Sequence, residues 1–172
     1  MDEIFAKIQR DRKYWGSNGG ITLTGGEPFM QPLFASELLK KCYDSYIHTA
    51  VETCGNVPWK NIERSLEFID WIFYDIKHIE TSKHKAMTSV GNELIFQNVR
   101  KLAKDFRGMI IFRVPVIPGF NDDEATILDL SDFFTSIGRN EVNILPVHHL
   151  GREKYNLVGK GYYTDDFHSP GK

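Results

Sequence analysis

The chain alternates short apolar runs with segments of helical periodicity, and this alternation restricts its fold more than any other feature. Five apolar runs are separated by Gly- and Pro-containing segments, at 20–24, 47–52, 71–77, 109–117 and 142–147. Between these runs, apolar residues recur at the spacing of an amphipathic helix. Strands that alternate with helices indicate right-handed βαβ units and a parallel sheet. We therefore predict an α/β fold with about five parallel strands.

The most apolar runs and the residues before the helical segments refine this prediction. Residues 71–74 and 109–112 are apolar without a break, which predicts strands that are buried on both faces. Asn92 precedes one helical segment, and Asn121 with Asp122 precedes another. Asparagine and aspartate are typical of helix N-termini, so we expect these residues to mark helix starts.

The two ends of the chain are unusual for such a fold. A helical pattern over residues 2–15 opens the chain without a preceding strand, which would leave the edge of the first strand unpaired. Residues 159–172 show no helical period. We therefore expect residues 1–158 to be part of a larger α/β barrel or sheet, and residues 159–172 to form an irregular C-terminal tail. A complete small domain is the alternative.

Composition excludes several classes of protein. The 172 residues carry a net charge of -2, which gives neither the basic footprint of a nucleic-acid-binding protein nor a polybasic membrane patch. No apolar run reaches the length of about 18 residues that a membrane span needs, and the charged N-terminus differs from a signal peptide. Cys42 and Cys54 are too few for a disulfide framework or a zinc site of their own. We expect a cytoplasmic protein.

Polar or glycine residues follow every predicted strand, although the strands themselves are apolar. Ligands of parallel α/β proteins bind at the carboxyl ends of the strands, so the residues at these ends are candidates for one common site. In chain order they are Gly25, Gly26, Glu27, Thr53, Asp75, Ile76, Lys77, Arg113 and His148.

Several of these candidates suit an amino-acid ligand. The pair Gly25–Gly26 lets a ligand approach the main chain, although a simple tight turn is the alternative. Glu27 can accept hydrogen bonds from an ammonium group. Asp75 and Lys77 alternate along a strand, so both point to the same face. They suit a zwitterion, with an exposed ion pair as the alternative.

The remaining polar candidates depend on their neighbours. Arg113 lies within an apolar strand and needs a partner if it is buried, for which Glu52 or Asp75 could serve. His148 and His149 are adjacent and face opposite ways on an extended segment, so one of them is expected to point into the site. A structural histidine is the alternative.

Five motifs, in the right order and at the right strand ends, resemble the radical S-adenosylmethionine enzymes. They are Gly-Gly-Ile-Thr-Leu-Thr-Gly-Gly-Glu-Pro, Glu-Thr-Cys-Gly, Asp-Ile-Lys, Arg-Val-Pro-Val-Ile-Pro-Gly-Phe-Asn-Asp and Leu-Pro-Val-His-His-Leu-Gly. The resemblance covers roughly residues 2–158 and is greatest to the glycyl-radical-enzyme activating enzymes, typified by pyruvate formate-lyase activating enzyme. It implies a partial (β/α) barrel of the radical-SAM type whose first strand is missing.

The resemblance assigns roles within an S-adenosylmethionine site. Gly25, Gly26 and Glu27 match the motif that contacts the methionyl amino group. The segment 75–77 matches the strand end that holds the amino-acid and ribose portions, with Ile76 acting through its backbone. His148 matches the histidine at the nucleoside end of the ligand.

Two further assignments follow from the same resemblance. Thr53 and Asp75 match positions at which the activating enzymes bind a monovalent cation, although Glu52 stands beside Thr53 where an Asp is more usual. Arg113 matches a strand arginine near the ligand.

The resemblance also implies an activity. In this family a [4Fe–4S] cluster reduces S-adenosylmethionine, releasing methionine and a 5′-deoxyadenosyl radical, which takes a hydrogen atom from a glycine of the partner enzyme. The implied partners are a glycyl radical enzyme, such as pyruvate formate-lyase or a relative, and reduced flavodoxin or ferredoxin as electron donor. The protein positions the reactants, since the cofactors carry the hard chemistry.

The sequence departs from the family in its cysteines. The family holds the cluster with Cys-x3-Cys-x2-Cys, and no such motif occurs here. Two distant cysteines cannot replace three clustered thiolates. We therefore expect the C-terminal part of an activase, inactive alone. The alternatives are another radical-SAM reaction, such as activation of anaerobic ribonucleotide reductase or modification of a small molecule or peptide, and a cluster-less binding half barrel without catalysis.

Overall fold

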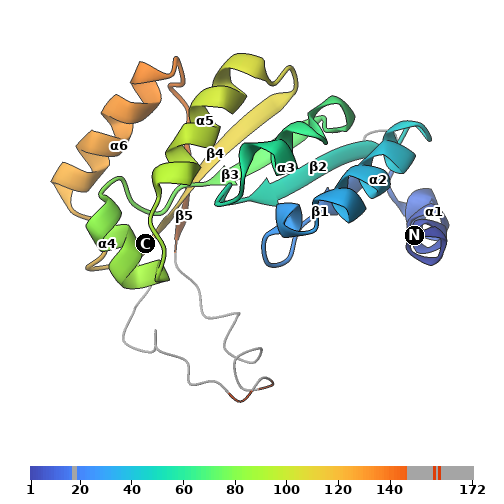
Figure 1. The fold of residues 1–172 in the computed structure, drawn as a ribbon, viewed down its shortest axis with the longest axis horizontal. Coiled ribbons are helices and arrows are strands. Elements are labelled where there is room, and N and C mark those ends of the chain that lie inside the picture. Colours follow the sequence, from blue (N-terminus) through green and yellow to red (C-terminus); the bar gives the residue numbers. More distant parts are fainter. Residues whose placement is uncertain (17–18, 147–156, 158, 160–172) are drawn as a thin grey trace.

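The computed structural model describes residues 1–16, 19–146, 157 and 159. Its centre is one sheet of five parallel strands in the order β1-β2-β3-β4-β5 (Figure 1). The strands are β1 (Gly20–Leu23), β2 (His48–Thr53), β3 (Trp71–Asp75), β4 (Met109–Val116) and β5 (Asn143–Pro146). The predicted α/β fold with five parallel strands is confirmed, and so is the partial barrel, because the sheet is open between β1 and β5.

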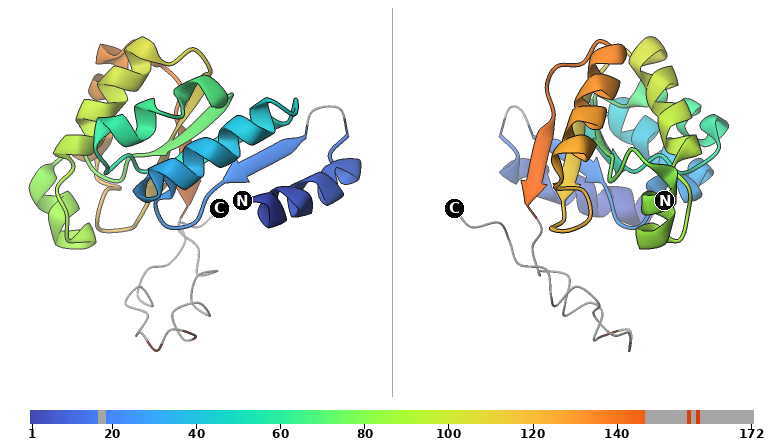
Figure 2. Two further views of the ribbon diagram at one scale, coloured as in Figure 1. Left: turned by 45° about the vertical axis from the view of Figure 1, so that its right-hand side comes forward. Right: turned by 90° about the vertical axis from the view of Figure 1, so that its left-hand side faces the viewer.

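Helices connect the strands as the periodicity predicts. They are α1 (Asp2–Asp11), α2 (Pro32–Tyr43), α3 (Trp59–Glu63), α4 (Thr81–Thr88), α5 (Glu93–Asp105) and α6 (Glu124–Ser136), with short 3-10 turns at Arg12–Tyr14, Pro28–Met30 and Leu66–Phe68. Helix α1 lies beside α2 at the β1 end of the sheet, whereas α5 and α6 lie towards the β4–β5 end (Figure 2). None of the helices that the structure describes is both long and apolar enough to span a membrane.

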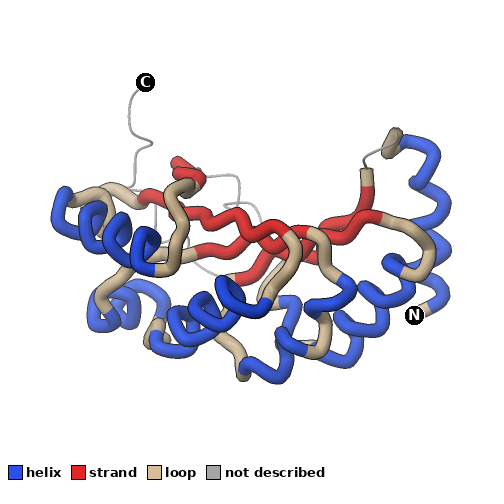
Figure 3. The backbone as a smooth tube through the Cα atoms, turned by 90° about the horizontal axis from the view of Figure 1, so that it is seen from above, coloured by secondary structure: helices blue, strands red, loops and turns tan. Residues whose placement is uncertain are grey.

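The helices lie on one face of the sheet, and no described helix covers the other face (Figure 3). The side chains of β3 and β4 accordingly alternate between buried and more exposed positions. The prediction that these strands are buried on both faces is therefore wrong: Trp71 is 38% exposed and Met109 is 51% exposed. The second face is the inner, concave face of an open barrel, where apolar residues have no helix to pack against.

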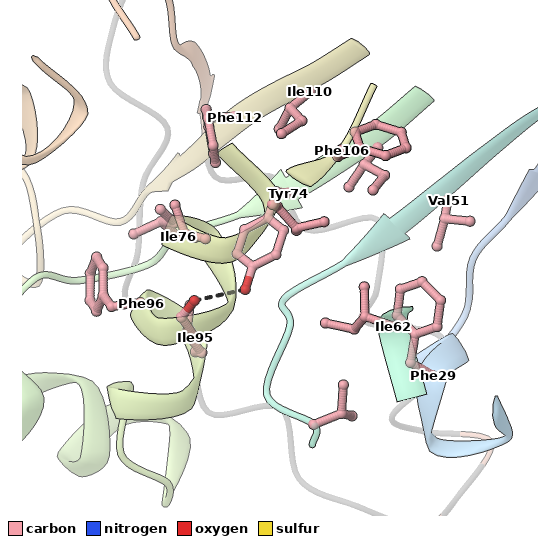
Figure 4. Packing of buried hydrophobic residues seen from close by; sticks show 14 of the residues in the cluster. Phe29, Val51, Ile62, Tyr74, Ile76, Ile95, Phe96, Phe106, Ile110 and Phe112 are labelled. Carbon is pink, nitrogen blue, oxygen red and sulfur yellow. Dashed lines mark hydrogen bonds between the residues drawn. The ribbon is translucent and has the colours of Figure 1, made fainter. Parts of the chain in front are cut away.

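The main core lies between the sheet and the helices (Figure 4). Val51, Tyr74 and Phe112 from three neighbouring strands are almost fully buried there. Tyr74 is the largest of the fully buried residues, and its hydroxyl donates to the main-chain oxygen of Ile95 in α5 at 2.8 Å. Gly55 is required beside it, because a Cβ at that position would overlap the Tyr74 hydroxyl. The core thus fixes the loop after β2 against α5.

The predicted helix start at Asn92 is confirmed in position, whereas the capping residue of α6 is Asp123, one residue after the predicted pair Asn121–Asp122. Helix α6 begins after Asp123, whose carboxylate accepts from Thr126 N at 3.0 Å. Asn92 does occupy the position before α5, but its side chain makes no capping bond. Asn92 and Asn121 instead bond to loops at the carboxyl edge of the sheet. A pattern in the local sequence cannot reveal these bonds, since their partners lie elsewhere in the chain.

Candidate functional site

All predicted site residues that the structure describes lie at the carboxyl edge of the sheet. Parallel pairing brings the ends of β1 to β4 to this edge, and in the β3–β4 pair Asp75 stands opposite Arg113. Gly25, Gly26 and Glu27 follow β1, and Thr53 ends β2. His148 lies outside the described residues, as does most of the predicted boundary and tail around 158–172.

A polar belt crosses four strands on the inner face of the sheet; we define it as Thr24, Glu52, Asp75 and Arg113. Arg113 Nε donates to Asp75 Oδ1 at 2.7 Å, and Arg113 Nη1 donates to Glu52 Oε1 at 3.1 Å. The Thr24 hydroxyl donates to Glu52 Oε2 at 2.9 Å. The prediction that Glu52 or Asp75 would pair with Arg113 is confirmed for both carboxylates.

Burial and charge set the ionisation of the polar belt. The Arg113 side chain is only 15% exposed, and its guanidinium lies 5.3 Å from the centre of the Phe73 ring. Burial alone would lower the pKa of Arg113, but the hydrogen bonds with Asp75 and Glu52 outweigh it and raise this pKa. The hydrogen bond from Arg113 lowers the pKa of Glu52, against the opposing effect of burial. By residue type the belt holds two acidic side chains and one guanidinium, a formal charge of about -1.

The main chain at Gly25 and Gly26 is open to a ligand. Gly25 has a φ of +129°, a conformation that side chains rarely adopt, and a Cβ at either glycine would meet no atom within 4 Å. The glycines are therefore not required by close packing within the described chain. The chain bends at Gly25 and Gly26, and the space beside both of them leaves their main chain accessible.

Glu27 connects the loop after β1 to the end of β2. Its carboxylate accepts from the Thr53 hydroxyl at 2.8 Å and from Cys54 N at 3.1 Å, and also from Phe29 N at 3.2 Å. The buried Thr53 hydroxyl in turn accepts from Gly55 N at 2.8 Å. These internal bonds already engage both Glu27 oxygens. An ammonium group bound at Glu27 would therefore share these oxygens with Thr53, Cys54 and Phe29.

The strand end 75–77 alternates between the two faces. Ile76 is fully buried, and its N–H donates to Arg113 O at 2.9 Å. Asp75 and Lys77 on either side of it are both partly exposed, as the strand pattern predicts. Within the described part of the chain no ion pair joins Asp75 to Lys77, so the simple ion-pair alternative is not observed.

The side chains of Thr53 and Asp75 do not fit one monovalent cation. Thr53 pairs in register with the buried Tyr74 and points to the helix face, where its hydroxyl bonds to Glu27. Asp75 points to the inner face and is bonded by Arg113. The guanidinium of Arg113 already supplies a positive charge between the belt carboxylates.

The two cysteines do not fit an iron–sulfur cluster. Cys42 is fully buried in α2, and burial raises its pKa to about 11. Burial also raises the pKa of Cys54, with a smaller contribution from the nearby Glu27 carboxylate. Cys42 lies in α2 and Cys54 follows β2, and two thiols on separate elements cannot supply the three clustered ligands of such a cluster. The residues that the structure describes form no group of three His, Cys, Asp or Glu able to hold a metal.

Sequence reasoning did not assign roles to Thr24 or to the buried asparagines near the site. Thr24 could have been found from strand alternation, because Thr22 and Thr24 fall on one face. Asn98 could have been found from helical periodicity, because it lies on the same apolar face as Ile95 and Leu102. A polar residue on such a face needs hydrogen-bond partners when buried.

The sequence is similar to those of activating enzymes from two bacteria. The chain is 43% identical over 167 residues to a 4-hydroxyphenylacetate decarboxylase activating enzyme of Clostridioides difficile (strain 630), covering 96% of this chain and 53% of that protein. It is 39% identical over 162 residues to an isethionate sulfite-lyase activating enzyme of Nitratidesulfovibrio vulgaris, covering 93% of this chain and 52% of that protein. The chain thus spans about half the length of these relatives.

A solved structure and a family model complete the comparison. The fold matches the crystal structure of a domain of a pyruvate-formate lyase-activating enzyme from Bacteroides vulgatus, with a TM-score of 0.73 and 30% sequence identity, covering 90% of this chain and 87% of that one. The family model described as the Radical SAM superfamily matches residues 1–131. The chain therefore belongs to the radical SAM superfamily, and its similar relatives are glycyl-radical-enzyme activating enzymes.

Proposed function

We propose that this chain is the S-adenosylmethionine-binding part of an activase that generates a glycyl radical on a partner enzyme. The observation that carries the proposal is the convergence, at one sheet edge, of the polar belt, the open main chain of Gly25–Gly26 and the segment 75–77. The similar relatives are named as activating enzymes of a decarboxylase and a sulfite-lyase, which supports a glycyl radical enzyme as partner.

The charge of the site suits this ligand. S-adenosylmethionine carries a sulfonium and an ammonium, both positive, together with one carboxylate. The polar belt has a formal charge of about -1 and faces the open side of the sheet. A partly buried carboxylate pair held by one arginine attracts a cation more strongly than exposed carboxylates would, because solvent screens it less.

Each part of the ligand has a partner in the proposed site. The Gly25–Gly26 main chain and Glu27 receive the methionyl ammonium, and Lys77 binds the carboxylate. Asp75 binds the ribose hydroxyls through Oδ2, because Arg113 engages Oδ1. Arg113 aligns Asp75 and Glu52 through its hydrogen bonds, and Ile76 lines the site through its backbone.

The whole activity requires groups that the described residues do not supply. When bound, a [4Fe–4S] cluster and S-adenosylmethionine supply the radical chemistry that removes a hydrogen atom from the partner's glycine. We place the cluster ligands outside this stretch, because its two cysteines lie on separate elements and are fewer than the three that such a cluster needs. Four points remain predictions. They are the role of His148 at the nucleoside end, reduced flavodoxin or ferredoxin as electron donor, pyruvate formate-lyase as the specific partner, and a cytoplasmic location.

The test uses the full-length protein that contains this sequence, reconstituted anaerobically with iron and sulfide. We expect it to cleave S-adenosylmethionine to 5′-deoxyadenosine and to produce a glycyl-radical EPR doublet on its partner. Asp75→Asn should abolish both signals, whereas the matched change Asp44→Asn, at an exposed residue after α2, should leave them unchanged. An active Asp75→Asn enzyme, or a reconstituted wild type that cleaves no S-adenosylmethionine, would overturn the proposal.

A further inference from the structure

Asparagine side chains hold the loops at the carboxyl edge of the sheet. Each of them donates from Nδ2 to a main-chain oxygen of a loop that follows a strand, and Asn121 also donates to one within β4, at 2.7 to 3.0 Å. The donors and their acceptors are Asn61 to Phe29, Asn98 to Gly55 and Val57, Asn92 to His78 and Ile79, and Asn121 to Lys77 and Pro115. The loops after β1, β2 and β3 are all held in this way.

Asn121 is the one that acts on the segment 75–77. Its side chain is 1% exposed, and Nδ2 donates to Lys77 O at 2.7 Å and to Pro115 O at 2.8 Å. Its Oδ1 accepts from Ile117 N at 2.7 Å. Two acceptors and one donor around the amide fix its orientation, since a flipped amide would face carbonyls with its own oxygen.

Beyond the last hydrogen bond between β3 and β4, asparagine side chains bond the main chain of this segment. Strand β3 ends at Asp75, and the last bond that joins this segment to β4 is the one from Ile76 N to Arg113 O. Beyond this bond, the Lys77 carbonyl is bonded by Asn121, and the carbonyls of His78 and Ile79 are bonded by Asn92. The carbonyls of Lys77, His78 and Ile79 are therefore bonded by buried asparagine side chains rather than by a neighbouring strand.

We propose that Asn121 is a positioning residue that directs the Lys77 side chain to the ligand. The inference rests on the proposed function, in which Lys77 binds the ligand carboxylate. A long lysine side chain loses much rotational freedom when it binds, so a fixed backbone at Lys77 improves binding by holding the start of that side chain in place. Asn121→Asp keeps the shape but turns an acceptor oxygen towards two carbonyl oxygens, which releases the Lys77 peptide.

The test is a double-mutant cycle on binding of S-adenosylhomocysteine to the full-length, cluster-loaded protein. We expect Asn121→Asp to weaken binding about tenfold when Lys77 is present, because a displaced Lys77 loses its charged hydrogen bond to the ligand carboxylate. In a Lys77→Met background the same change should weaken binding less than about twofold, because Asn121 acts through Lys77.

Asn98→Asp is the matched control. Asn98 is as buried as Asn121 and also bonds two carbonyls, but those of Gly55 and Val57. Its effect should multiply with that of Lys77→Met, as for independent sites. If Asn121→Asp lowers the melting temperature so far that binding cannot be measured, Asn121→Ser, which removes the amide without adding charge, replaces it in the cycle.

The outcomes separate the two proposals. If Lys77→Met itself leaves the affinity unchanged, the role of Lys77 in the proposed function is wrong, and the inference falls with it. If Lys77→Met weakens binding but its effect multiplies with that of Asn121→Asp, the proposed function stands and the positioning role of Asn121 is overturned. Coupling at Asn121 together with independence at Asn98 supports both.

Discussion

Arg113 Nε donates to Asp75 Oδ1 at 2.7 Å across the β3–β4 pair, and the two residues are directly opposite in the parallel register. The same guanidinium reaches over β3 to Glu52 in β2 at 3.1 Å. One side chain thus connects the ends of three strands. Because Arg113 comes from an otherwise apolar strand, its position beside two carboxylates is the main electrostatic feature of the candidate site.

We predict that Arg113→Met destabilises the protein and weakens ligand binding. Removing the guanidinium leaves the Glu52 and Asp75 carboxylates without their shared hydrogen-bond donor. We expect the free energy of unfolding to fall by about 1–3 kcal/mol, because partly buried carboxylates lose a partner. Arg113→Lys should recover only part of this loss, because an ammonium cannot reproduce the fork geometry of arginine. Urea unfolding of the three proteins measures the effect, and equal stability of all three would contradict it.

Acid should remove the contribution of Glu52 to stability. The folded-state pKa of Glu52 lies below its ordinary value of 4.5, so the stabilisation is fully present above pH 4.5 and is lost as the pH falls through the lowered folded pKa. Glu52→Gln should therefore flatten the acid side of a stability–pH curve. Glu37→Gln, at an exposed position, is the control. The prediction would be ruled out if the free energy of unfolding fell equally with pH in Glu52→Gln and in the wild type.

The two open glycines should respond differently to a methyl group. Gly25→Ala places a side chain at a φ of +129° and should destabilise the protein by about 1–3 kcal/mol through backbone strain. Gly26→Ala has free space and should leave the melting temperature nearly unchanged while weakening binding of S-adenosylhomocysteine, because the methyl covers the main chain. Thermal unfolding and calorimetry measure both effects, and a Gly26→Ala protein with unchanged affinity would argue against ligand contact there.

Thr53→Val tests the bond between the first two loops. Valine keeps the shape of threonine but leaves the Glu27 carboxylate and Gly55 N without the hydroxyl that joins them. A loss of about 1–3 kcal/mol is expected, because buried polar groups lose a partner. Thr53→Ser keeps the hydroxyl and should lose less stability. Hydrogen exchange at the Gly55 amide reports the local effect: it should rise in Thr53→Val, and an unchanged rate would show that the hydroxyl is not needed.

The sequence predicted where the strands are and at which edge the polar residues meet. Alternation of apolar runs with helical periodicity is a local property, and it placed five strands close to their observed bounds. It failed for the inner face of β3 and β4, where Trp71 and Met109 are exposed, because apolar residues follow the same pattern whether helices or an open barrel face them.

The sequence by itself determined the α/β fold with about five parallel strands and the family, because periodicity and motif spacing are properties of the local sequence. Only the tertiary structure decided which side chains share bonds. Arg113 and Glu52 are 61 residues apart, and Asn121 and Lys77 are 44 residues apart. Hydrogen bonds depend on distances below about 3.2 Å and on direction, and separations of that kind are fixed only when the strands have paired and the helices have packed.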